Sequence, residues 1–177
     1  DNAVGGFSIT MPTVTLEPGD ERQPCWIFPL EVEGPSRFVA AASITTSDGM
    51  HHGNITTRPK TGEGFRECGR GGGDEATDVL NGGAVLFGSS TQLVGTEWHK
   101  FVPGQAYRVK DGYEVVARMH YLNTSTKPLT VAPEYHWYTI PEDEVVEELA
   151  PFAWAMTDFE IPPHAEHTSE IECGFYK

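Results

Sequence analysis

Short runs of alternating apolar and polar residues, separated by turn residues, dominate the 177-residue chain. An alternation with a period of two is typical of half-buried strands, and the runs are rich in the β-branched and aromatic residues that strands favour. Thirteen prolines and 19 glycines interrupt the pattern. It predicts about nine strands, at 7–11, 26–32, 38–44, 107–109, 113–122, 129–131, 135–140, 152–159 and 168–176.

This series of short strands predicts an all-β fold, an antiparallel β-sandwich of jelly-roll-like type. The turn residues between the runs support the divisions, and Asp111-Gly112 is a dipeptide typical of a β-hairpin. Helix is expected only in short pieces, such as 78–80 or 142–149. The stretch 57–83, with its glycine cluster, is expected to be irregular.

Charge and hydropathy exclude several classes of partner. Twelve basic residues against 26 acidic ones give a formal net charge of -14, which repels the phosphates of nucleic acid and of anionic lipid surfaces. No apolar run approaches the roughly 20 residues of a membrane span, and no signal-like apolar segment opens the chain. We therefore expect a processed, soluble protein without membrane insertion and without a nucleic-acid partner.

The chain has three cysteines, so any single disulfide leaves one cysteine over. Pairing Cys25 with Cys68 is the simplest choice, and it would stabilise the fold by roughly 4 kcal/mol in the chain-entropy model. A disulfide would place the protein in an oxidising compartment. Sequons at Asn54 and Asn123 are compatible with secretion from a eukaryotic cell.

Three histidines form the most informative group of polar residues. His51 and His52 are adjacent, and His120 lies in the predicted strand 113–122. Three neutral imidazoles with an open coordination position suit copper or zinc. Adjacent strand residues point to opposite faces, so His51 and His52 reach one ion only through a bend, which Gly49 and Gly53 would permit, or through different ring nitrogens.

The histidines also have an interpretation without a metal, in which the pair lies on a surface loop and His120 is a hydrogen-bonded strand residue. By the same alternation, Met119 faces away from His120 and is not expected to share its ion. His99 and His136 are each expected to be packed or hydrogen-bonded. His164 and His167 follow two prolines, which favour extended chain, so a second metal site there is not expected.

Several segments together resemble successive landmarks of one protein family. The order of these segments resembles the N-terminal domain of the copper type II, ascorbate-dependent monooxygenases, the group that contains peptidylglycine α-hydroxylating monooxygenase and dopamine β-monooxygenase. In that family each of two β-sandwich domains carries a copper ion. The resembling segments are 48–52, 101–109, 113–121 and 158–163, continuing to Cys173.

The resemblance implies a ligand set and a disulfide. It places the copper ligands of the N-terminal domain at His51, His52 and His120, with Met119 where the family has valine. It also places a family disulfide at Cys25 and Cys68. The implied role is a mononuclear copper that receives an electron from ascorbate and passes it on, with no catalytic side chain for the hydroxylation itself in this chain.

The family's second copper, where oxygen and substrate meet, is held by a His-x-His pair and a methionine in a C-terminal domain. This chain contains no His-x-His pair. The resemblance therefore implies a longer two-copper protein, with a copper-binding domain over 1–157 and a final strand over 158–177 that resembles the start of the second domain. From the expected disulfide, we expect the protein to be secreted, extracellular or periplasmic. Two other interpretations remain: a non-catalytic binding or scaffold module, and an autonomous copper or zinc protein.

Overall fold

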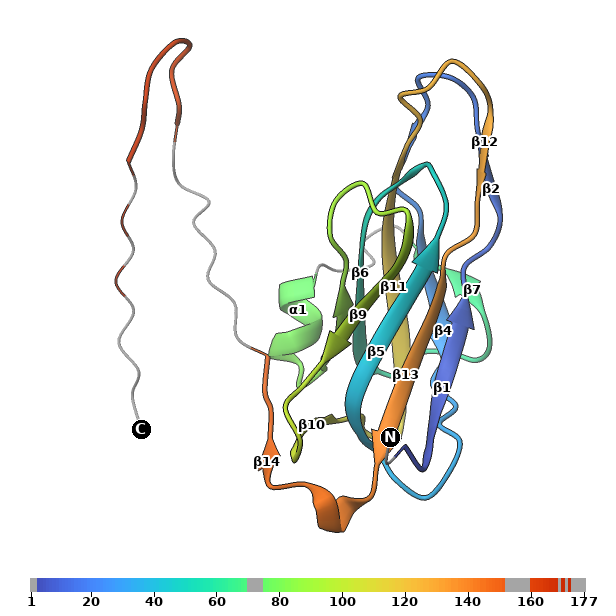
Figure 1. The fold of residues 1–177 in the computed structure, drawn as a ribbon, viewed down its shortest axis with the longest axis vertical. Helices are drawn as coiled ribbons and strands as arrows, with labels where there is room; N and C mark the ends of the chain where they lie inside the picture. The colour runs from blue at the N-terminus through green and yellow to red at the C-terminus, as the bar shows by residue number, and fades with distance from the viewer. Residues whose placement is uncertain (1–2, 70–74, 152–159, 169, 171, 173–177) are drawn as a thin grey trace.

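The structure is a computed structural model that describes residues 3–69, 75–151, 160–168, 170 and 172. Two six-stranded sheets make up most of it (Figure 1). The first sheet contains β1 (Gly5–Thr10), β5 (Phe38–Thr46), β9 (Gly95–Lys100), β10 (Gln105–Arg108), β13 (Glu134–Ile140) and β14 (Glu147–Glu148). The second contains β3 (Glu21–Arg22), β4 (Cys25–Pro29), β6 (Met50–Pro59), β7 (Arg66–Glu67), β8 (Val85–Gly88) and β11 (Tyr113–Leu122).

Four small elements complete the described fold. Strands β2 (Val14–Leu16) and β12 (Leu129–Val131) form an antiparallel pair. One α-helix, α1 (Glu75–Leu80), and one 3-10 helix, η1 (Glu142–Glu144), are both short. The predicted all-β fold is confirmed, with helix only in short pieces, as expected. The jelly-roll-like connection of the strands stays a prediction.

Both sheets contribute to one apolar core. Ile44 and Trp137 come from the first sheet, Ile55 and Tyr121 from the second, and all four are almost completely buried. The indole nitrogen of Trp137, on β13, donates a hydrogen bond of 3.0 Å to the backbone oxygen of Leu86 on β8. This bond links the two sheets inside the core, where an unpaired indole N–H would be costly.

Strand β11 forms the centre of the second sheet, between β4 and β6. Its partners β4 and β6 run antiparallel to it, in registers that extend along most of its length. Met119 and Tyr121 are buried in the core, whereas Arg118 and His120 are only partly buried. The alternation predicted from the sequence is therefore confirmed, and it turns His120 away from the core.

The structure corrects three expectations. The described chain has 14 strands, more than the predicted number, because several strands are short or mostly polar. Asp111-Gly112 forms a turn, but no hairpin, since β10 and β11 belong to different sheets. The stretch 57–83 is not wholly irregular: it includes the end of β6, all of β7 and helix α1.

The C-terminal expectations are largely outside the described residues. The predicted strand 152–159 and most of 168–176 belong to that part of the chain. The described residues 160–168 form no strand. The division into a domain over 1–157 and a final strand over 158–177 stays a prediction.

Candidate metal centre

A β-bulge brings His51 and His52 to the same side of β6. In the pairing of β6 with β11, His120 lies opposite His52, and the next residue, Tyr121, lies opposite Met50. His51 is therefore the extra residue, without a partner in the register. A bulge of this kind breaks the strict alternation of side chains. It is the bend that the sequence required for both imidazoles to reach one ion.

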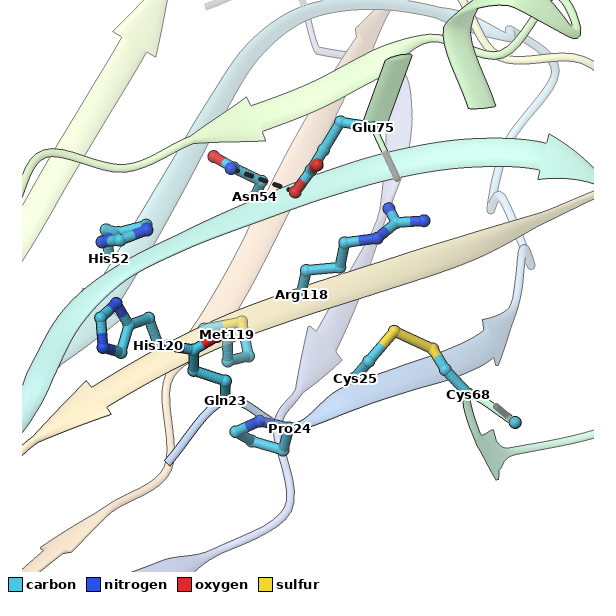
Figure 2. Close-up of a pocket in the computed structure, with 11 residues that line it drawn as sticks. Gln23, Pro24, Cys25, His52, Asn54, Cys68, Glu75, Arg118, Met119 and His120 are labelled. Atoms are coloured by element: carbon cyan, nitrogen blue, oxygen red, sulfur yellow. Dashed lines mark hydrogen bonds between the residues drawn. A yellow bond between two sulfur atoms is a disulfide. The ribbon is translucent and has the colours of Figure 1, made fainter. Parts of the chain in front are cut away.

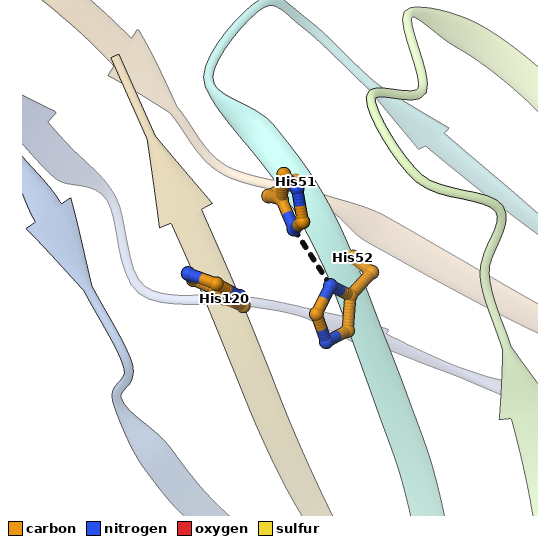
Figure 3. Close-up of side chains that lie close together, drawn as sticks. All are labelled: His51, His52 and His120. Carbon is orange, nitrogen blue, oxygen red and sulfur yellow. Dashed lines mark hydrogen bonds between the residues drawn. The ribbon is translucent and has the colours of Figure 1, made fainter. Parts of the chain in front are cut away.

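The three imidazole rings lie in mutual contact (Figure 3). The ring centroid of His51 is 4.9 Å from that of His52 and 4.6 Å from that of His120, and the rings of His52 and His120 are 4.9 Å apart. One ligand nitrogen from each ring lies within 4.8 Å of the other two. The structure thus brings together all three of the histidines that the sequence singled out.

Two of these rings share a hydrogen bond. Nδ1 of His51 and Nδ1 of His52 are 2.8 Å apart, so one of them donates a proton and the other accepts it. Two nitrogens bound to one ion at about 2.0 Å can be no more than roughly 4 Å apart. The three rings would therefore have to move closer together to hold one ion through these nitrogens, and whichever of His51 and His52 donates would first need its proton on Nε2.

The surroundings of His52 favour its neutral, ligating form. Burial lowers the pKa of His52, and the neighbouring imidazoles of His120 and His51 lower it further, while the carboxylate of Glu75 acts in the opposite direction. A neutral imidazole keeps a lone pair for a metal. All three rings are partly buried, so the group is reachable from solvent.

Two glycines around the pair have different functions. Gly49 has a φ of 99°, a left-handed conformation that suits the turn between β5 and β6. Gly53 does not need such a conformation, but a Cβ there would lie 2.6 Å from Cε of Met119. The sequence interpretation gave both glycines the role of permitting the bend. Gly53 instead gives the core side of β11 room to pack behind the histidines.

A cavity of about 340 Å³ opens beside His52 and His120, and polar side chains line much of it (Figure 2). In its wall, Nδ2 of Asn54 donates to Glu75 at 3.3 Å. The guanidinium of Arg118, which also lines the cavity, forms an ion pair of 2.7 Å with the buried carboxylate of Asp78. Sequence reasoning assigned none of these residues to the site, because their partners come from separate elements.

The predicted disulfide between Cys25 and Cys68 is present, with Cα atoms 5.3 Å apart. It joins β4 to the segment that follows β7, and it lines the same cavity as His52 and His120 (Figure 2). A structural disulfide indicates folding in an oxidising environment. Within the described residues, no helix is long and apolar enough to cross a membrane.

The remaining histidines lie elsewhere. His99 stacks on Phe87 with ring centroids 4.1 Å apart, and its Nε2 lies 3.0 Å from Glu97. His136 lies 3.2 Å from Glu134. Both are packed or hydrogen-bonded, as predicted. In the part of the chain that the structure describes, no other three histidine, cysteine or acidic residues form a group that could hold a metal.

One contact of the centre had no signal in the sequence. Nε2 of His120 lies 2.6 Å from Oε1 of Glu21, a residue 99 positions earlier in the chain. Glu21 belongs to the two-residue strand β3, which no hydrophobic pattern marks. The contact depends on the pairing of β3 with β11, which becomes visible only in three dimensions.

Comparison with known proteins adds no family to this picture. No model of a known protein family matches the chain, and a search of curated proteins finds no significant match. The function must therefore be argued from the residues and their geometry.

Proposed function

We propose that this chain is a copper-binding redox domain, in which His51, His52 and His120 hold one ion that relays electrons for an ascorbate-dependent monooxygenase. The observation that carries the proposal is the three-imidazole group itself. The resemblance of the surrounding segments to the copper type II monooxygenases supports the choice of reaction.

The donor set is compatible with copper, and the resemblance decides between copper and zinc. Three neutral nitrogen ligands suit both copper and zinc, and the absence of a thiolate or carboxylate from the group does not favour either ion over the other. The resemblance favours copper. When bound, copper would supply one-electron chemistry, accepting an electron from ascorbate and passing it onward.

The residues of the chain would prepare this centre in four ways. The bulge at His51 directs two adjacent rings to one side of the sheet. Partial burial lowers the pKa of His52 and so favours its neutral form, and the cavity beside His52 and His120 leaves the centre open to a small reductant. The disulfide holds one wall of this cavity.

The complete reaction would need a partner. We propose a second copper-bearing domain beyond the C-terminus as the site of hydroxylation, because the resembling enzymes use two copper ions. We also propose that the protein is secreted, extracellular or periplasmic, in agreement with the disulfide.

Copper loading tests the proposal. Purified, tag-free protein is titrated with Cu(II) and followed by EPR, and the expected result is one bound ion per chain with nitrogen hyperfine structure. Ascorbate should then abolish the EPR signal as Cu(II) becomes Cu(I). His120→Ala should remove the site, whereas His136→Ala, which changes a histidine of the other sheet, should leave it intact.

The outcomes separate the alternatives. Absence of stoichiometric metal in the wild-type protein would favour a binding or scaffold module. Tight binding of zinc together with a Cu(II) signal that ascorbate does not remove would favour a zinc protein or a metal carrier. An EPR spectrum unchanged by His120→Ala would overturn the ligand assignment.

A further inference from the structure

We propose that Glu21 is a positioning residue that holds His120 in the tautomer with its proton on Nε2, and so presents Nδ1 to the metal. The inference rests on the proposed metal-binding function. It concerns a residue outside the three-histidine group, which contacts one of the three rings.

The contact between the two side chains is short and has a clear direction. Oε1 of Glu21 lies 2.6 Å from Nε2 of His120. An ionised carboxylate only accepts hydrogen bonds, so Nε2 of His120 must donate. In a neutral imidazole the other nitrogen, Nδ1, then carries the lone pair.

The fold holds Glu21 in place for this contact. In the pairing of β3 with β11, Glu21 lies opposite Leu122, which makes it the diagonal neighbour of His120 on the same face. The turn before β3 is fixed as well, since the backbone N–H of Asn123 donates to the carbonyl of Asp20 at 2.9 Å. Glu21 therefore reaches His120 from an anchored backbone.

The assignment agrees with the other two rings. His51 and His52 already face each other through their Nδ1 atoms. Figure 2 shows one nitrogen of the His120 ring on the side of His52 and the other on the far side of the ring. With Nε2 bound by Glu21, Nδ1 is the nitrogen of His120 left for an ion. Carboxylates that hold the second nitrogen of a ligating histidine fix both its tautomer and its orientation.

NMR of the metal-free protein tests the tautomer directly. Long-range ¹H–¹⁵N spectra at about pH 8, well above the pKa of a free imidazole, distinguish Nδ1–H from Nε2–H. We expect His120 to be the Nε2–H tautomer in the wild type and a mixture of tautomers in Glu21→Ala. Glu21→Gln should largely restore the wild-type spectrum, because the amide oxygen still accepts the hydrogen bond.

Metal affinity provides the second readout. Competition titrations with Zn²⁺ and with Cu(I) should show affinity lower by about 10- to 100-fold in Glu21→Ala, with partial recovery in Glu21→Gln. Glu134→Ala is the matched control, because Glu134 pairs with His136 in the same way and the side chains of Glu21 and Glu134 are 55% and 49% exposed. The control should bind metal as the wild type does.

Each result decides a separate point. An unchanged His120 tautomer and unchanged metal affinity in Glu21→Ala would overturn the role of Glu21 while leaving the metal site standing. A wild-type protein that binds neither Zn²⁺ nor copper would overturn the proposed function, and with it the presentation of Nδ1. Equal loss of affinity in Glu134→Ala would show an effect of net charge alone, which also overturns the proposal.

Discussion

His52 and His120 are direct partners across β6 and β11, with ring centroids 4.9 Å apart. Directly opposite residues on paired strands lie close together, and no loop has to become ordered to bring them there. The sheet itself therefore positions two of the three histidines of the candidate metal centre. His51 joins them through the bulge next to this pair. A centre built on paired strands is more rigid than one built on loops.

A metal that binds the three histidines should stabilise the folded protein. Zn²⁺ is a suitable probe because it has no redox chemistry, and a ligand at 100 times its Kd raises the free energy of unfolding by about 2.7 kcal/mol. We expect this increase in urea denaturation of the wild type, and its removal by a chelator. His120→Ala should show no increase, while His136→Ala should respond as the wild type does.

A side chain at position 53 should disturb the packing behind the centre. A Cβ on Gly53 would meet Cε and Sδ of Met119 at 2.6 and 2.9 Å, and the hydroxyl of Tyr135 at 2.9 Å. We expect Gly53→Ala to lower the free energy of unfolding by about 1–3 kcal/mol, measured by urea denaturation.

The clash with Met119 can be separated from other effects by a double-mutant cycle. Met119→Ala removes the nearest atoms, so Gly53→Ala should cost less in that background than alone. Gly88→Ala, on the neighbouring strand, is the control, since its Cβ would meet nothing closer than 3.6 Å. Additive effects of the two substitutions would show that contact with Met119 is not the cause.

Strand β11 shows what the sequence could predict. Its apolar residues alternate clearly enough to assign the strand, and the alternation alone placed Met119 and His120 on opposite faces. Cys25 and Cys68 could be paired because the chain has few cysteines. In these cases the signal is local, or the number of alternatives is small.

Strand β6 shows why the rest was missed. Its sequence contains a glycine, two histidines and two threonines, and it becomes a strand because it lies between β11 and β8. Tertiary pairing overrides a weak local preference of this kind. The contact of Glu21 with His120 depends on a different long-range pairing, that of β3 with β11, and no single-sequence pattern encodes it.

The sequon at Asn123 should remain unmodified in the folded protein. The Asn123 side chain is fully buried, and its Nδ2 donates to the backbone oxygens of Leu16 and Lys127 at 3.0 and 2.8 Å. A glycan on Nδ2 would replace one of these donors and requires space that the fold lacks. We expect mass spectrometry of protein secreted from eukaryotic cells to find no glycan on Asn123.

A positive control shows whether the host would have modified an accessible site. The turn near Glu63 and Phe65 is exposed, and Glu63→Asn together with Phe65→Thr creates a sequon there. This variant should gain one glycan. A glycan on Asn123 in protein that is otherwise folded would contradict the hydrogen bonding described for this residue.

The buried carboxylate of Glu114 should make stability depend on pH. Its oxygens accept from Arg58 at 2.9 Å, Arg66 at 2.6 Å and Thr61 at 2.9 Å. Burial alone would raise the pKa of Glu114, but the hydrogen bonds from Arg66, Arg58 and Thr61 outweigh it, so the pKa is lowered. Because the folded protein holds the charged form more strongly than the unfolded chain does, the stabilisation is complete above the ordinary pKa and is lost as pH falls through the lowered one.

Urea denaturation of wild type and Glu114→Gln across this range tests the assignment. Other carboxylates contribute to the pH dependence of both proteins, so the difference between the two reports Glu114. We expect the variant to be less stable at pH 7, with the gap narrowing as pH falls below the ordinary carboxyl pKa of about 4.3. Glu114→Ala should cost roughly 3 kcal/mol at pH 7, the lower end for a broken buried pair, because Arg58 and Arg66 remain partly exposed. A gap that stays constant with pH would show that Glu114 contributes through packing and not through its charge.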